Sequence, residues 1–102
     1  MSEQPFNWSG RRENDPAHQR VAEFLLMDIQ QSPEWGQELA TQIDTVISGE
    51  LANWERIGNA FRLELSNQSA EIEDMVDPSH PKQVIPIEEF RTAVLAWCEK
   101  IS

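Results

Sequence analysis

The chain has 102 residues, of which 18 are acidic and 8 basic, so its formal net charge is −10 at pH 7. This length is enough for one hydrophobic core and too short for two, so we expect a single domain. The negative field disfavours binding to the phosphate backbones of nucleic acids and favours basic protein partners.

Residues 1–14 mix Pro, Gly, Asn and Ser without a sustained period, which predicts an irregular N-terminal arm. A single α+β domain is then expected over residues 15–102. Phe6 and Trp8 lie close together in the arm, and we expect them to hold it against the domain. An anchor for a partner protein is the alternative interpretation.

The first helix is expected from Asp15 and Pro16, a typical N-cap and first helical residue, to about Gln31. Its apolar side recurs at helical spacing through Ala22, Leu25, Leu26 and Ile29. Its solvent side is expected to carry Arg20, Glu23 and Asp28.

A second helix is expected to start at Ser32 and Pro33 and to end at Gly49, the residue type that favours a helix C-terminus. Its apolar side comprises Trp35, Leu39, Ile43, Val46 and Ile47.

Residues 61–73 have the pattern of a β-hairpin. Phe61, Leu63 and Leu65 alternate with polar residues, the segment Ser66–Ser69 suits a loop, and Ala70 and Ile72 continue the alternation. Residues 51–57 fit either a short strand or a last helical turn. Gly58 and Asn59 suit a turn or a bulge.

The loop after Met75 contains Pro78 and Pro81, which exclude regular structure there. Val84 and Ile85 suit one short edge pairing. After Pro86, a last helix is predicted from the spacing of Ile87, Phe90, Val94, Trp97 and Ile101.

These elements predict an α+β fold with two N-terminal helices, a two- or three-stranded antiparallel meander and a C-terminal helix. The helices are expected to pack on one face of the sheet. The expected core comprises Phe61, Leu63, Leu65 and Ile72 against Phe90, Val94 and Trp97.

The sequence carries no pattern typical of catalysis, a cofactor or a metal. His18 and His80 are expected to be solvated, and no HxxxH, HExxH, CxxC or Gly-rich phosphate motif occurs. Cys98, the single Cys, cannot form an internal disulfide and is expected to be a packed thiol. We therefore expect no catalytic, cofactor-binding or metal-binding residues.

The densest acidic run comprises Glu71, Glu73, Asp74 and Asp77, and it lacks the DxDxDG pattern of a calcium loop. It is expected to be a solvated face or a docking patch for a basic partner. Arg62 is expected to pair with Glu73 across the hairpin. The candidate partner-binding residues are Arg62, Glu64, Glu71, Glu73, Asp74 and Asp77.

The run WERIGNAFRLEL at 54–65 resembles the YacL-like family of small bacterial proteins, in which a W-x-R-x-G-x-x-aromatic-x-L run leads into a hairpin. The segment EEFRTAVLAWCEKI at 88–101 is similar to the closing helix of that family. The resemblance covers the second half of the chain, and Ser66–Ser69 replaces the family's Asp-Gly turn. It implies the fold and a bacterial origin, and it implies no activity.

The leading functional hypothesis is a non-catalytic protein-interaction module that binds a basic partner, such as an immunity or inhibitor protein that neutralises a basic toxin. One alternative is a small hydrolase or isomerase using His80 with Asp77 or a neighbouring carboxylate. Another is a structural homodimer formed through a sheet edge. Without a leader-like segment or a membrane-length apolar run, we expect a cytoplasmic protein, monomeric or homodimeric, that binds neither nucleic acid nor membrane.

Overall fold

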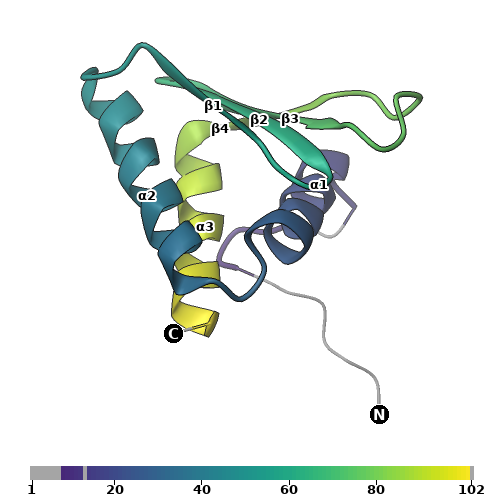
Figure 1. The fold of residues 1–102 in the computed structure, drawn as a ribbon, viewed down its shortest axis with the longest axis horizontal. Coiled ribbons are helices and arrows are strands. Elements are labelled where there is room, and N and C mark those ends of the chain that lie inside the picture. The colour runs from purple at the N-terminus through teal and green to yellow at the C-terminus, as the bar shows by residue number, and fades with distance from the viewer. Residues whose placement is uncertain (1–7, 13, 102) are drawn as a thin grey trace.

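The computed structural model describes residues 8–12 and 14–101. An antiparallel sheet is covered on one face by helices, so the expected α+β class is confirmed (Figure 1). The helices are α1 (Pro16–Phe24), α2 (Pro33–Ser48) and α3 (Ile87–Ile101), with a π-helical segment η1 (Leu25–Ile29) continuing α1. The strands are β1 (Asn53–Ile57), β2 (Phe61–Ser66), β3 (Ser69–Asp74) and β4 (Gln83–Pro86).

The sheet has four strands in the order β1-β2-β3-β4, so the expected number of two or three strands is wrong. Both segments that the sequence left open belong to the sheet. Residues 53–57 form a strand because the turn after Ile57 folds them back onto β2, with Ile57 opposite Arg62. Gln83–Pro86 forms the fourth strand because Ile85 packs into the core opposite Ala70.

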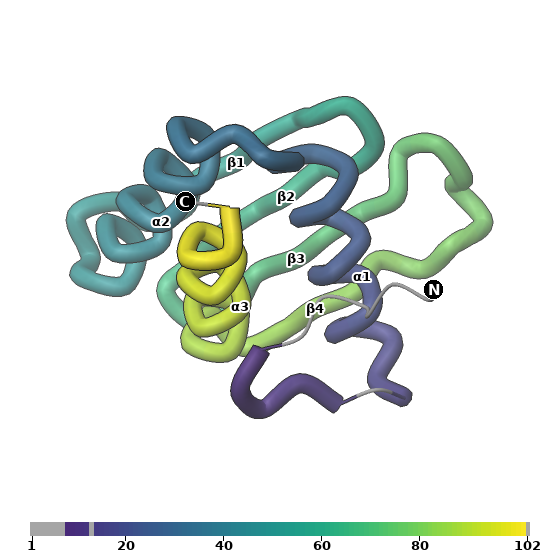
Figure 2. The backbone as a smooth tube through the Cα atoms, turned by 90° about the horizontal axis from the view of Figure 1, so that it is seen from below, coloured from purple at the N-terminus to yellow at the C-terminus, as the bar shows by residue number. Residues whose placement is uncertain are grey.

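Helices α1 and α2 begin where their capping residues predict, and α2 also ends at its predicted capping residue. The Asp15 carboxylate accepts a hydrogen bond from the backbone nitrogen of Ala17 at 2.9 Å, and the Ser32 hydroxyl accepts one from Trp35 at 3.3 Å. Gly49 follows α2 with a φ of 88°, a conformation that glycine adopts without steric cost. Seen from the helical side, α3 lies between α2 and α1 (Figure 2).

The end of the first helix differs from the expectation. The α-helix stops at Phe24 and widens into the π-helical turn η1, which ends at Gln30 with a φ of 59°. The wider turn changes the helical phase, so that Leu25, Asp28 and Ile29 are all buried. The Gln30 carbonyl accepts a hydrogen bond from Nε1 of Trp97 at 2.7 Å.

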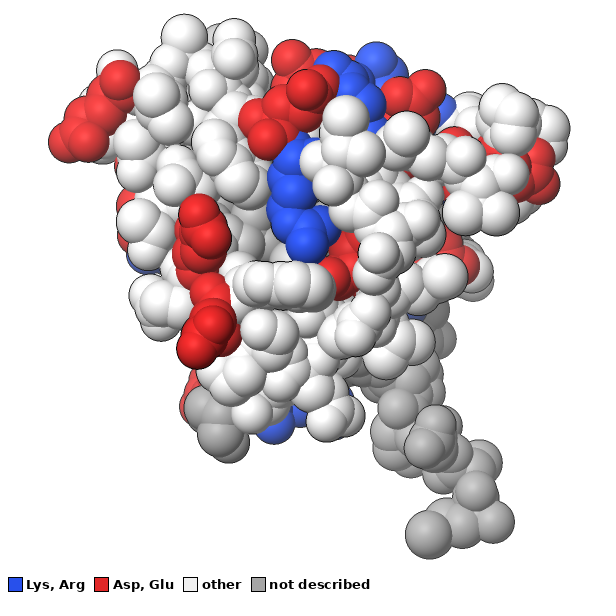
Figure 3. All heavy atoms as spheres, in the orientation of Figure 1, with Lys and Arg blue, Asp and Glu red and all other residues white. Residues whose placement is uncertain are grey.

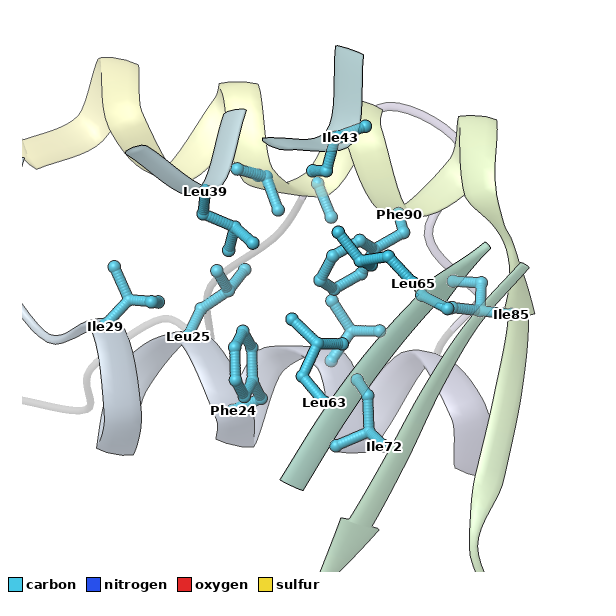
Figure 4. Packing of buried hydrophobic residues seen from close by; sticks show 14 of the residues in the cluster. Phe24, Leu25, Ile29, Leu39, Ile43, Leu63, Leu65, Ile72, Ile85 and Phe90 are labelled. Carbon is cyan, nitrogen blue, oxygen red and sulfur yellow. The ribbon is translucent and has the colours of Figure 1, made fainter. Parts of the chain in front are cut away.

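The core lies between the sheet and the helices, and every residue expected in it is buried. Phe24 stands at its centre, with its ring centroid 6.3 Å from that of Phe61 and 6.1 Å from that of Phe90 (Figure 4). Ring pairs at this separation add to the stability that burial itself supplies.

His18 is buried, so its expected position at the solvent surface is wrong. Its Nδ1 accepts a hydrogen bond from the backbone nitrogen of Arg12 at 2.9 Å. The proton therefore lies on Nε2, which donates to Oε1 of Glu89 at 3.0 Å. The indole of Trp8 covers the imidazole, with centroids 5.7 Å apart. Trp8 thus packs on the core, as expected, whereas Phe6 lies outside the described residues.

Arg20 was expected on the solvent side of α1, and it is buried instead. Its Nη1 donates to the carbonyl of Ile72 on β3 at 3.1 Å. Its guanidinium carbon lies 5.9 Å from the centroid of the Phe61 ring. The side chain therefore packs against the sheet. A backbone carbonyl and an aromatic face stabilise its positive charge there.

Candidate binding surface

The outer face of the sheet, opposite the helices, gathers four of the six candidate partner-binding residues. The register sets Arg62 opposite Glu73 and Glu64 opposite Glu71 on neighbouring strands. Glu55 of β1 stands beside Glu64 on the same face. This face is therefore charged from β1 to β3, because alternate residues of each strand point away from the core.

Arg62 is the centre of an ion-pair network on this face. It pairs with Glu55, with Glu64 at 3.7 Å and with Glu73 at 3.9 Å, so the expected Arg62–Glu73 contact is present. The hydrogen bond to Glu55 raises the pKa of the Arg62 guanidinium. Lys82 pairs with Glu71 at 2.9 Å. The negative charge on this face is only partly neutralised, because four carboxylates share two cations.

Asp74 and Asp77, the other two candidates, belong to the loop after β3. Asp74 accepts hydrogen bonds from the backbone nitrogens of Val76 at 2.9 Å and Asp77 at 3.0 Å. Its other oxygen lies 2.8 Å from Nδ1 of His80. The hydrogen bond from His80, with those from the backbone, lowers the pKa of Asp74 to about 2.

His80 is held by carboxylates on both sides of its ring. Its Nε2 lies 3.4 Å from Oδ2 of Asp77, and its Nδ1 faces Asp74. The Asp74 hydrogen bond, and then the charge of Asp77, raise the pKa of His80. With both ring nitrogens turned to these carboxylates, the arrangement favours a role in holding the loop.

A hollow of about 230 Å³ lies on the other side of β1, between that strand and α2. Its lining combines aromatic, acidic and basic side chains: Trp35, Glu38, Leu39, Trp54 and Arg56. Trp35 was expected on the buried side of α2, yet 45% of it is exposed. Figure 3 shows a face of the molecule on which basic atoms lie between acidic groups.

Arg56 is fixed in the hollow from two directions. Its guanidinium carbon lies 5.3 Å from the centroid of the Trp35 ring. Its Nη2 donates to the Asp28 carbonyl at 3.5 Å, and its Nη1 lies 3.8 Å from Oδ2 of Asp28. Nη1 is buried and makes no hydrogen bond with the described residues. The side chain is thereby held over the Trp35 ring.

Asp28 is the buried anchor of this arrangement and was expected on the solvent side of the first helix. It is fully buried, and its two oxygens accept hydrogen bonds from the backbone nitrogens of Ala60 at 2.9 Å and Phe61 at 3.1 Å. The expectation is wrong because η1 turns Asp28 inward, where it satisfies the β1–β2 turn. Gly58 lies so close to Asp28 and Arg56 that a Cβ there would clash with both.

Cys98 is half-buried, with its Sγ facing Gly36, and burial raises the pKa of the thiol. Within residues 8–12 and 14–101, no group of three or more His, Cys, Asp or Glu side chains is arranged to hold a metal ion. No helix in the described part of the chain is long and apolar enough to cross a membrane.

Comparison with known proteins finds no matching family model, no matching curated protein and no matching solved structure. The resemblance to the YacL-like family therefore stays a prediction.

Proposed function

We propose that the protein is a non-catalytic interaction module that binds a basic protein partner at the β1 side of the sheet. The observation that carries this proposal is the hollow beside β1, whose lining brings Trp35, Trp54 and Arg56 together with the acidic side chain of Glu38. Trp and Arg dominate the binding energy of protein interfaces when they sit in fixed positions.

The charge around the hollow supports a basic partner. Glu38 lines the hollow, and Glu55 lies on the strand that borders it. On the adjoining outer face, the four carboxylates of Glu55, Glu64, Glu71 and Glu73 share two cations, Arg62 and Lys82. The excess of negative charge, in a chain of net charge −10, accelerates encounter with a positive surface.

A concrete version of the proposal is an immunity or inhibitor protein that neutralises a basic toxin. The small size, the acidic charge and the preformed aromatic hollow all suit a protein that must bind one partner quickly. In this version the candidate residues Arg62, Glu64, Glu71 and Glu73 supply charge on the adjoining outer face of β2 and β3, while Asp74 and Asp77 hold the loop after β3.

The test is capture of a partner from the native host, followed by affinity measurements with the purified partner over a range of salt concentrations. We expect a basic partner whose dissociation constant rises steeply with salt. The double variant Glu38→Gln/Glu55→Gln should weaken binding by roughly tenfold at low salt. Salt-insensitive binding, or a neutral partner, would contradict the proposal.

The matched control is Glu23→Gln/Glu88→Gln, which removes the same charge from α1 and α3. It should leave the affinity almost unchanged. Equal weakening by both double variants would mean that net charge alone attracts the partner, and it would remove the β1 side as the binding surface.

A further inference from the structure

The backbone of β1 has an open edge, and one hydrogen bond at its end shows which of its residues face that edge. Gly58 donates to the Phe61 carbonyl at 3.0 Å, directly across the β1–β2 pair. Because hydrogen-bonded and non-hydrogen-bonded pairs alternate in an antiparallel ladder, Trp54 and Arg56 bond to β2. The N–H and C=O groups of Asn53, Glu55 and Ile57 therefore point away from the sheet.

The opposite edge is built differently. The backbone nitrogen of Ile87 donates to the Gln68 carbonyl at 3.0 Å. Because hydrogen-bonded pairs alternate along the ladder, Gln83 and Ile85 are the residues of β4 that form backbone hydrogen bonds with β3. The outward positions on β4 are then Val84 and Pro86, and Pro86 has no N–H to offer. A proline on a short edge strand blocks the addition of another strand, whereas β1 contains no proline.

The hollow beside β1 provides space for a side chain of an added strand. Residues of a fifth strand would alternate between the helical side, where the hollow lies, and the outer face. On the helical side, a side chain would meet Trp35 and Trp54, with the Glu38 carboxylate at the rim. On the outer face, it would lie beside Glu55.

The charges on either side of β1 favour a basic strand as the occupant of this edge. Carboxylates border both sides of the open strand, through Glu38 in the hollow and Glu55 on the outer face. Arg56 adds little opposing charge, because it pairs with the buried Asp28. Arg62 pairs with Glu55 on the outer face, but it is shared with Glu64 and Glu73, so a net negative charge remains there. Lysine or arginine side chains of an added strand would therefore find carboxylates on either face, and their aliphatic stems would pack on the indoles.

A second copy of this chain fits the edge poorly. Two β1 strands paired around a two-fold axis through the middle of the strand would place the two copies of Glu55 directly opposite each other. Like charges at such a position destabilise an antiparallel pair. The structural homodimer expected as an alternative would thus meet repulsion at this edge.

We propose that β1 accepts an extended, lysine- or arginine-rich segment of the partner as a fifth strand, with one of its side chains in the hollow. This inference rests on the proposed function and specifies how the basic partner is held. Backbone hydrogen bonds from Asn53, Glu55 and Ile57 supply the register, and the indoles and carboxylates supply the selectivity.

The test uses a short peptide of alternating lysine and valine as the probe, added to the full-length protein and followed by amide hydrogen exchange. We expect the amides of Asn53, Glu55 and Ile57 to gain protection on binding. Those of Trp54 and Arg56 already bond to β2 and should change little. The same peptide N-methylated at every second residue, in the frame that faces β1, should bind at least about tenfold more weakly, because it lacks the backbone donors.

The matched variants are Ile57→Pro and Val84→Pro, each of which removes one outward N–H beneath an exposed side chain. Ile57→Pro should weaken peptide binding by about tenfold, and Val84→Pro should leave it unchanged. Circular dichroism of both variants would confirm that the fold persists. Equal effects of the two substitutions would overturn strand addition at β1.

Two results separate this inference from the proposed function. If both peptides bind equally and Glu38→Gln/Glu55→Gln weakens both, strand addition is wrong while acidic recognition of a basic partner stands. If the unmethylated peptide does not bind at millimolar concentration, strand addition is overturned. The proposed function is then decided by the captured partner and its salt dependence.

Discussion

Asp28 and Asp74 each accept two backbone hydrogen bonds and pair with a basic side chain, one in the protein interior and the other at the surface. Asp28 accepts hydrogen bonds from Ala60 and Phe61 and pairs with Arg56, and it is fully buried. Asp74 accepts hydrogen bonds from Val76 and Asp77 and pairs with His80, and 53% of the His80 side chain is exposed.

The difference lies in what each cluster connects. Asp28 reaches from η1 to a turn more than thirty positions later in the chain, and so ties the helical layer to the β1–β2 end of the sheet. Asp74 bonds within its own loop. A buried carboxylate that loses its partners leaves uncompensated charge and unsatisfied donors, whereas water replaces the partners of an exposed one. We therefore expect the β1 side to depend on Asp28 much more than the β4 side depends on Asp74.

The largest expected effect is that of Asp28→Ala. It removes the acceptor for two buried backbone N–H groups and the partner of Arg56, so we expect a loss of about 3–5 kcal/mol in the free energy of unfolding. Asp74→Ala should shift the urea midpoint far less, since water can reach the freed groups. Equal shifts for the two variants would break the comparison.

Gly58→Ala should cost about 1–3 kcal/mol, because its Cβ would clash with Asp28 and Arg56. Urea denaturation of the single variants and of Asp28→Ala/Gly58→Ala completes a double-mutant cycle. The glycine substitution should cost less in the double variant, where the obstructing carboxylate is gone. Additive costs would show that Gly58 is required for another reason.

Gln30→Gly is expected to stabilise the protein by about 1 kcal/mol relative to Gln30→Ala. Gln30 has a φ of 59° and a ψ of −143°, a region that only glycine adopts readily. This strained residue ends the π-helical turn that directs Asp28 inward. Thermal melts of the two variants provide the measurement. A less stable glycine variant would mean that the backbone there is not strained.

The smallest effect is the pH dependence of the Asp74 loop. The raised pKa of His80 means that its stabilising contribution is complete below about 6.5 and is lost as pH rises through the raised value. The pKa of Asp74, lowered to about 2, means that its contribution is present above 3.8 and is lost as pH falls toward 2.

The loop should therefore be most protected between these limits, as amide exchange at Val76 and Asp77 can measure. His80→Gln should remove the loss on the alkaline side and reduce the acidic one, because only the backbone hydrogen bonds of Val76 and Asp77 then lower the pKa of Asp74. An unchanged profile in that variant would show that His80 does not hold the loop.

The sequence predicted the fold where its signals are local. The caps at Asp15 and Ser32, the alternation around Leu63 and the spacing around Trp97 all depend on neighbouring residues, and the elements follow them. Residues 53–57 could not be assigned in this way, because their alternation is short and only pairing with β2 makes them a strand.

The candidate surface was predicted in part for the same reason. Period-two alternation placed Arg62, Glu64, Glu71 and Glu73 on one face, and the register brings them together. The hollow was missed because Trp35 and Arg56 meet only in three dimensions. Asp28 was missed because a π-helical turn leaves no mark in an apolar pattern with a period of 3.6. The combination of Trp54 and Arg56 on alternate positions of one short segment was the available signal.

The distribution of the four tryptophans gives the protein a built-in optical reporter. The chain has no Tyr, so its ultraviolet emission comes from indoles. Trp8 and Trp97 are buried, while Trp35 and Trp54 line the hollow. Occupation of the hollow should shift the emission of Trp35 and Trp54 to shorter wavelengths. Unfolding should instead shift the emission of the two buried indoles to longer wavelengths. A single emission spectrum can therefore distinguish a bound molecule from a denatured one without any added label.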